Sequence, residues 1–224
     1  LKSSMITLLS LVRDHGTPKL FRAGSSLFFQ GEVPRDVYII QDGIVRGYSI
    51  SSTGDERITA LYGKADIVPL AWVLGGTTAS FTYYQAVSDT RILEVQKTRF
   101  DAIVGSKPLA ARKLIEATGR EYAGSMLRII SLTQSRTLDK LAYSFYYLAH
   151  RFGIERENGE TVINIKLSQI MLASMIGQTR EGTARNIKEL VKMEIISYTG
   201  STYTVYTTRL LALLGEESFR DLRK

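Results

Sequence analysis

The segment Leu167–Leu190, LSQIMLASMIGQTREGTARNIKEL, contains two short amphipathic patterns that meet at Gly177. On each side of this glycine, apolar residues recur every three or four positions, which is the spacing of one buried helix stripe. They are Ile170, Leu172, Ala173 and Ile176 in the first pattern, and Ala184, Ile187, Leu190 and Val191 in the second. Gly177 can adopt the positive φ that a tight turn between helices often requires. The segment therefore predicts a helix-turn-helix.

Charged side chains occupy the other face of the second expected helix. The burial stripe leaves Arg180, Glu181, Arg185 and Lys188 outside, so these side chains are expected to point to solvent. Thr179 stands where the N-cap of this helix belongs, and Ser168 where that of the first helix belongs. An exposed helix with this charge pattern suits the major groove of DNA.

The composition limits the classes of function. A length of 224 residues with 44% hydrophobic residues allows one large domain or two modest ones, and two fit the pattern better. The net charge of +7 is compatible with a polyanionic partner, although many basic proteins bind no nucleic acid. The absence of cysteine excludes disulfides, thiol switches and cysteine-ligated iron–sulfur clusters.

The sequence predicts no membrane partner and no bound cofactor. No apolar run approaches the roughly 18 residues that span a bilayer, and no secretory cleavage pattern follows Leu1, so we expect a soluble, cytoplasmic protein. His15 and His150 are the only histidines, and neither lies where it could serve a sensor site between the β-rich region and the helix after it. We therefore expect neither a metal site nor haem.

The region between Pro18 and Val104 has the pattern of an antiparallel β-structure. Short β-rich runs alternate with turns, and an Asp42–Gly43 turn separates two of the runs. The runs are Leu27–Phe29, Asp36–Gln41, Ile44–Ile50, Arg57–Tyr62, Phe81–Val87 and Arg91–Val95. This arrangement predicts an antiparallel sandwich or roll.

A long helix is expected from Pro108 to Thr133. Its apolar seam comprises Ile115, Thr118, Tyr122, Met126, Ile129 and Leu132. Gly119 and Gly124 weaken the helix by about 1 kcal/mol each, so packing must compensate. The seam could be buried within the chain, which is the usual role of such a stripe, but its place between two expected domains favours dimerisation.

The elements after this helix complete a winged helix-turn-helix. A further helix is expected over Leu138–Phe152, and a hairpin around Gly200 is expected over Ile195–Thr207. The expected fold is α+β: an N-terminal antiparallel β-roll, a long dimerisation helix and a winged helix-turn-helix. The corresponding domains are residues 1–107 for the sensor-like roll, 108–136 for the dimerisation helix and hinge, and 137–224 for DNA binding.

These parts, in this order, resemble the Crp/Fnr superfamily of bacterial transcription regulators, and the resemblance covers nearly the whole chain. Its marks in the roll are Gly24, Gly31, Tyr38–Val45, Gly54-Asp55-Glu56 and Asp66. More specific is Arg180-Glu-Gly-Thr-Ala-Arg185, which matches the Arg-Glu-x-x-x-Arg pattern of the family. Gly182 departs from the small hydroxyl residue often found there, which removes one phosphate contact.

The resemblance implies a homodimer bound to a two-fold symmetric operator in double-stranded DNA, with a GTGA-like half-site. Arg180, Glu181 and Arg185 would contact base edges, since arginine can pair with guanine and glutamate can accept from the cytosine amino group. The implied phosphate or flanking contacts are Ser168, Gln169, Thr179 and Lys188. A contact with RNA polymerase is implied by the resemblance alone.

The chain departs from the cyclic-nucleotide members of the family. Those members hold phosphate and ribose with a Gly-Glu pair and an Arg followed by Ser or Thr, whereas Pro69-Leu70 and Ser80-Phe81 stand there in this chain. We therefore expect an effector other than cyclic AMP, or none. The candidate effector pocket comprises Trp72, Phe81, Tyr83, Tyr122 and Met126, which could equally be ordinary core residues.

Two other functions compete with a sequence-specific regulator. A ligand-binding module whose winged helix docks on proteins is the main alternative, but such a helix would more often expose aromatic residues than Arg180, Arg185 and Lys188. An enzyme is not expected, because the sequence shows no catalytic residues: it has no cysteine nucleophile, His-Asp-Ser set, metal-ligand spacing or phosphate loop.

Overall fold

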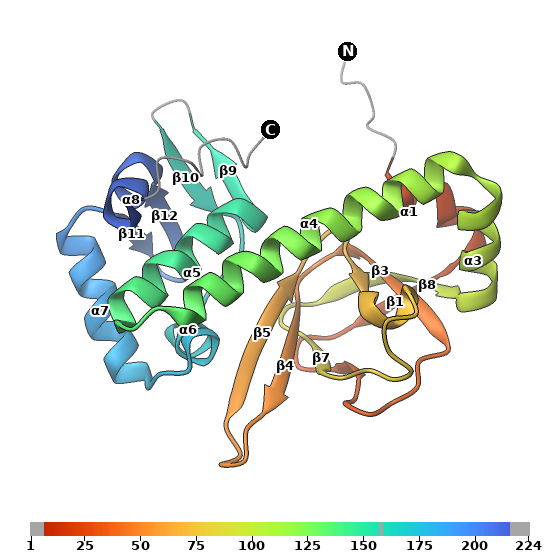
Figure 1. Ribbon diagram of the computed structural model, residues 1–224, viewed down its shortest axis with the longest axis horizontal. Helices are drawn as coiled ribbons and strands as arrows, with labels where there is room; N and C mark the ends of the chain where they lie inside the picture. The colour runs from red at the N-terminus through yellow and green to blue at the C-terminus, as the bar shows by residue number, and fades with distance from the viewer. Residues whose placement is uncertain (1–6, 157–158, 216–224) are drawn as a thin grey trace. The chain divides into compact units, whose positions relative to one another are not determined.

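The computed structural model describes residues 7–156 and 159–215 and has the expected α+β fold, with β-rich, helical and helix-turn-helix parts in that order (Figure 1). The chain forms two compact units that divide between Tyr122 and Ala123, inside a single long helix. The division into residues 1–107, 108–136 and 137–224 stays a prediction. Residues 1–6, 157–158 and 216–224 of those ranges lie outside the described part.

Two four-stranded antiparallel sheets form the roll of the first unit. One sheet has the order β1 (Thr17–Phe21), β8 (Thr90–Gln96), β3 (Asp36–Asp42), β6 (Ile67–Val68). The other has the order β2 (Ser26–Phe28), β7 (Tyr83–Ala86), β4 (Val45–Ile50), β5 (Glu56–Tyr62). The turn between β3 and β4 needs Gly43, which has a φ of 95° and whose added Cβ would lie 2.5 Å from the Thr90 hydroxyl.

Strand β3 of the first sheet contributes to two separate cores, because successive side chains of a strand point to opposite sides. Ile39 belongs to a core shared with helices α1 (Leu8–Val12), α2 (Leu70–Val73), α3 (Lys97–Ser106) and the start of α4 (Pro108–Thr133). The next residue, Ile40, belongs to a second core that Val45, Tyr84 and Ala86 of the other sheet share. The roll thus has one core between its sheets and one beneath its helices.

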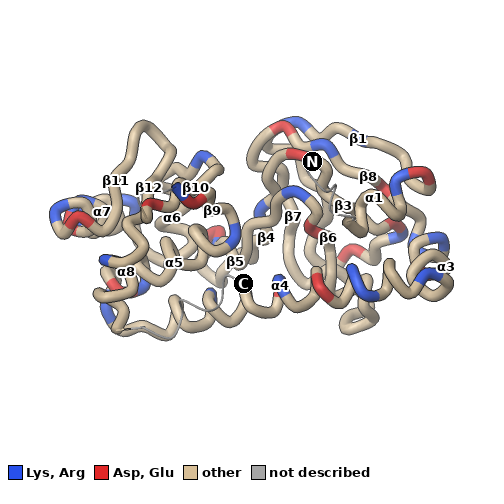
Figure 2. The backbone as a smooth tube through the Cα atoms, turned by 90° about the horizontal axis from the view of Figure 1, so that it is seen from above, with Lys and Arg blue, Asp and Glu red and all other residues tan. Residues whose placement is uncertain are grey.

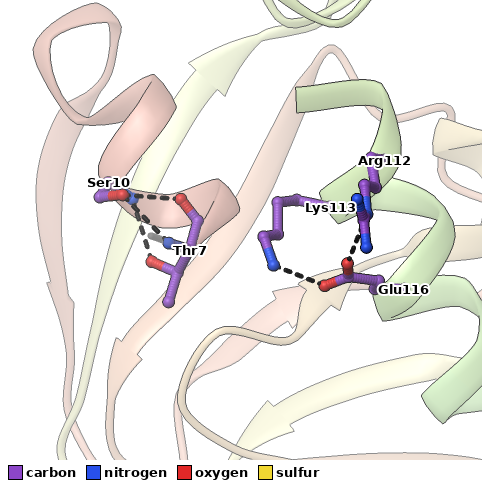
Figure 3. A network of polar contacts seen from close by, with 5 residues as sticks. All are labelled: Thr7, Ser10, Arg112, Lys113 and Glu116. Carbon is purple, nitrogen blue, oxygen red and sulfur yellow. Dashed lines mark hydrogen bonds and ion pairs between the residues drawn. The ribbon is translucent and has the colours of Figure 1, made fainter. Parts of the chain in front are cut away.

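Two small polar networks stabilise helix segments of this unit (Figure 3). A capping box starts α1, in which the Thr7 hydroxyl accepts from the Ser10 N–H at 3.2 Å and the Ser10 hydroxyl accepts from the Thr7 N–H at 3.2 Å. A 3₁₀ turn, η1 (Arg13–His15), follows α1. On α4, Glu116 accepts from Lys113 at 2.7 Å and from Arg112 at 3.3 Å, and Lys113, chiefly by its hydrogen bond, lowers the pKa of this half-buried carboxyl.

The second unit is built around α5 (Thr137–Phe152), in which every residue from Leu141 to Ala149 is buried. The remaining elements are β9 (Gly153–Glu155), β10 (Glu160–Ile163), α6 (Gln169–Ile176), α7 (Arg180–Lys192), β11 (Ile196–Thr199), β12 (Thr202–Tyr206) and α8 (Thr207–Leu214). Its antiparallel sheet has the order β11-β12-β10-β9. The hairpin β11–β12 confirms the expected wing, and Gly200 in its turn has a φ of 60°.

Candidate nucleic-acid interface

The helix-turn-helix consists of α6 and α7, joined through Gly177 with φ 66° and ψ 38°. Each helix has a hydroxyl N-cap: Ser168 accepts from the Met171 N–H at 3.1 Å, and Thr179 accepts from the Gly182 N–H at 3.1 Å. A hydroxyl that accepts in this way still has its own proton to donate. Both caps can therefore hold a helix end and still donate to an acceptor such as a phosphate oxygen.

The expected burial stripe is largely correct, with two corrections. Leu172, Ala173 and Ile176 are buried in α6, as are Ile187 and Leu190 in α7, and Ala184 is half-buried. Ile170 is 62% exposed, because it lies two positions before Leu172 and thus on nearly the opposite side of the helix. Val191 lies at the edge of the α7 stripe and is 36% exposed.

Sequence analysis missed the residue that completes the α7 stripe, Thr183, which is fully buried. Its hydroxyl donates to the Thr179 carbonyl at 2.9 Å, so it needs no partner outside the helix. Asn186, half-buried one turn before Leu190, donates from its side-chain amide to the Gly182 carbonyl at 2.8 Å. Thr183 lies four residues before Ile187, a spacing that places both on one side of the helix. Because threonine carries a hydroxyl, this position was not assigned to the apolar stripe.

The outward face of α7 carries free charges. Arg180, Glu181, Arg185 and Lys188 are all exposed, and Figure 2 shows basic and acidic positions together on α7. Glu181, Arg185 and Lys188 follow a four-then-three spacing, which places them along one helix stripe. Within residues 7–156 and 159–215, no side chain forms an ion pair with any of the four. Their donors and acceptors are available to a ligand.

Three of the four expected phosphate-contacting residues lie at the starts of the two helices, and the fourth, Lys188, belongs to the stripe itself. Ser168 and Thr179 are exposed N-caps, Lys188 is exposed in the middle of α7, and Gln169 is half-buried at the first position of α6. The wing contributes no positive charge, since no lysine or arginine occurs between Ile195 and Tyr206. Any contact from the wing would use hydroxyl and backbone groups.

The residues of the candidate effector pocket have separate surroundings. Trp72 packs against the core beneath the roll helices, with the Lys97 ammonium 5.8 Å from the ring centre. Tyr83 stacks on Tyr48, with 5.1 Å between ring centres. Phe81 and Tyr122 are 58% and 66% exposed. Met126 is half-buried and belongs to the second unit, so the pocket stays a prediction.

Two family models match the chain in the order of its two units. Residues 18–107 match the model of a cyclic nucleotide-binding domain, and residues 139–214 match that of a Crp-like helix-turn-helix domain. The chain belongs to the Crp/Fnr superfamily. The resemblance noted from the Arg180–Arg185 motif and the order of the elements is thereby confirmed.

Two regulators illustrate the sequence similarity within the Crp/Fnr superfamily. The fumarate and nitrate reduction regulatory protein of Vibrio cholerae serotype O1 is 26% identical over 198 residues, which cover 88% of this chain and 78% of that protein. The protein of the same name from Escherichia coli K12 is 24% identical over 197 residues, which cover 88% of this chain and 78% of that protein. Both are regulators by name, and neither is named as an enzyme.

Solved structures of the superfamily share the fold. A CooA mutant from Carboxydothermus hydrogenoformans superposes with a TM-score of 0.76 at 19% identity, covering 94% of this chain and 96% of that one. FixK2 from Bradyrhizobium japonicum gives a TM-score of 0.73 at 20% identity, covering 88% of this chain and 96% of that one. The roll, long helix and helix-turn-helix are thus the shared architecture.

Among residues 7–156 and 159–215, no helix is both long and apolar enough to cross a membrane. The same part of the chain contains no cluster of three or more acidic or histidine side chains that could hold a metal ion.

Proposed function

We propose that this Crp/Fnr protein is a sequence-specific DNA-binding transcription regulator that acts as a homodimer in the cytoplasm. The observation that carries the proposal is the exposed stripe of Glu181, Arg185 and Lys188, which has no ion-pair partner among the described residues. A helix that only docks on another protein or stabilises the fold would be expected to pair or bury such charges. In the major groove, Arg180, Glu181 and Arg185 match the donors and acceptors of G·C base pairs.

The exposed face of α4 supports the homodimer. Ile115, Tyr122 and Ile129 recur every seven residues and are 71%, 66% and 52% exposed, and Leu132 is 45% exposed. Apolar residues that recur every seven positions are the pattern of a helix that pairs with another helix. A second copy of the chain supplies an identical stripe, so pairing buries both.

The roles of individual residues follow from this proposal. Arg180, Glu181 and Arg185 contact base edges, whereas Ser168, Gln169, Thr179 and Lys188 contact phosphates and flanking groups. The roll takes an effector other than cyclic AMP, or none, and Trp72, Phe81, Tyr83, Tyr122 and Met126 are the candidate effector residues. A contact with RNA polymerase is proposed from the superfamily alone.

Selection of operators from random duplex DNA by the full chain tests the proposal. We expect a two-fold symmetric site whose half-site centres lie about one DNA turn apart, roughly 34 Å. Arg185→Ala, which leaves the buried stripe intact, should fail to enrich that site. Equal recovery of all sequences by the unmodified protein would contradict the proposal and favour a protein-docking role, for which exposed Ile170 and Tyr198 are apolar candidates.

A further inference from the structure

Arg128 of α4 is a charged side chain in the interior of the second unit, where it is only 3% exposed. Its guanidinium donates to the Ser144 hydroxyl of α5 at 3.2 Å and to the Met175 carbonyl of α6 at 2.5 Å. It also lies 5.6 Å from the ring centre of Tyr147 on α5. One side chain thus joins three helices.

The surrounding face of α4 is built to let α5 approach. Gly124 and Ser131 lie four positions before and three positions after Arg128, so all three share this face. An added Cβ at Gly124 would meet Tyr147 at 3.4 Å, and Ser131 hydrogen-bonds with the Ser144 hydroxyl across 2.9 Å. This face lies opposite the exposed stripe of Tyr122 and Ile129, so the two surfaces of α4 serve different contacts.

The acceptor on α6 lies next to the turn of the helix-turn-helix. Met175 is the second-last residue of α6, and the last four carbonyls of a helix lack partners within it. A cation at a helix C-terminus is also favoured by the helix dipole. Burial lowers the pKa of the Arg128 guanidinium, which nevertheless keeps its charge at neutral pH. Arg128 therefore fixes the end of α6 just before Gly177.

We infer that Arg128 is a positioning residue that joins the last turns of α4 to the helix-turn-helix, so that the orientation of α7 is set by α4 and not by the connection at residues 134–136. The inference rests on the proposed dimeric DNA binding. In such a dimer, the paired α4 helices then determine the separation and angle of the two α7 helices. Arg128 acts through these helices and has no contact with DNA itself.

Operators with altered spacing test this role. The site selected by the unmodified protein is compared with versions that have one or two base pairs added or removed between the half-sites. The unmodified protein should prefer one spacing strongly, because two rigidly held helices fit one separation. Arg128→Met keeps most of the side-chain volume but removes every donor, and should reduce that preference by about fivefold or more.

Nonspecific DNA binding, two control variants and the melting temperature separate positioning from general stability. Affinity for nonspecific DNA should be unchanged in Arg128→Met, because the charges of α7 remain. Arg120→Met removes an exposed arginine from the same helix and should keep the spacing preference. Arg128→Lys should retain part of the spacing preference that Arg128→Met loses, since an ammonium can donate to one acceptor but does not present the guanidinium fork. A merely structural residue would lower the melting temperature without altering the ratio of affinities between spacings.

The outcomes are distinguishable from failure of the proposed function. If the unmodified protein binds no operator at any spacing, the proposed function fails, and the inference fails with it. If the unmodified protein prefers one spacing and folded Arg128→Met shows the same preference, the inference alone is wrong. Should Arg128→Met not fold, Arg128→Lys and Ser144→Ala carry the same comparison, and unchanged preferences in both would overturn it.

Discussion

The Thr179 hydroxyl accepts a hydrogen bond from the Gly182 N–H at 3.1 Å, so the N-cap of α7 stands directly before Arg180. Thr179→Ala removes this bond and should lower the free energy of unfolding by about 1 kcal/mol. It should also weaken operator binding, because the first turn of α7 carries two proposed base contacts. Urea denaturation and operator titration measure the two effects. Thr179→Ser retains the hydroxyl, and a loss equal to that of alanine would contradict the capping role.

Replacing Arg180 and replacing Lys188 of α7 should have different effects on DNA binding. Arg180→Ala should cost about 1 to 3 kcal/mol on the selected operator and relax the preference at one guanine. Lys188→Ala should weaken all DNA sequences alike and reduce the slope of log K against log salt by about 1. Titrations on matched and single-substituted operators at several salt concentrations compare the two variants. Loss of sequence preference in Lys188→Ala would reverse the assigned roles.

The elements that sequence analysis predicted well are those with a strong local pattern. The long helix was expected over Pro108–Thr133 and is observed with those bounds, and the turn at Gly177 was expected from its glycine. Strand β1 was missed because Pro18 lies in it, which the edge of a sheet tolerates. Strand β6 has two residues, too few for any periodicity to appear.

The interior role of Arg128 could not be predicted from a single helix pattern. An arginine is seldom buried, and its partners Ser144 and Met175 lie 16 and 47 residues away in the sequence. The pattern of α4 showed its apolar seam, whereas the opposite face of glycine, arginine and serine resembles an ordinary exposed surface. Only tertiary packing distinguishes the two. The same holds for Ile170, whose apolar side chain suggested burial that the structure contradicts.

Ile129→Asp should prevent formation of the proposed homodimer. The substitution places a carboxylate in the exposed apolar stripe of α4, where pairing would bury two like charges face to face. Sedimentation at micromolar concentration should show a monomer. Its melting temperature should be close to that expected for a single folded chain. Arg120→Asp puts a carboxylate on α4 outside the stripe and should remain dimeric. A dimer of unchanged stability in Ile129→Asp would exclude this stripe as the interface.

Tyr203 should make the second unit sensitive to alkali. It is buried against Phe145, with 5.1 Å between ring centres, and burial raises the pKa of its phenol from 10.0 to about 12. Its contribution is fully present below pH 10; above that pH the unfolded chain loses the proton and the folded chain keeps it, so stability falls until the pH passes about 12. The loss from this group is about 3 kcal/mol.

Tyr203→Phe isolates that effect, because it keeps the ring and removes the titrating group. Urea denaturation between pH 9 and about pH 12 should show a smaller alkaline loss in this variant than in the unmodified protein. Tyr84 is also buried with a raised pKa, so part of the alkaline loss should remain in both proteins. If both proteins lost the same stability between these pH values, the Tyr203 phenol would ionise as readily in the folded chain as in the unfolded one.

Cyclic AMP should neither bind this protein nor be required for DNA binding, although residues 18–107 match a cyclic nucleotide-binding domain. At the positions that the family resemblance assigns to nucleotide binding, Leu70 is apolar and buried, and the Ser80 hydroxyl already donates to the Thr82 carbonyl at 2.7 Å. A phosphate there would lack a cationic partner, and burying an unpaired charge costs more than apolar contacts return. Phe81→Arg alone should not create a site, because Pro69 has no N–H to offer. Calorimetry with the unmodified protein and this variant measures both, and a micromolar dissociation constant for the unmodified protein would refute the argument.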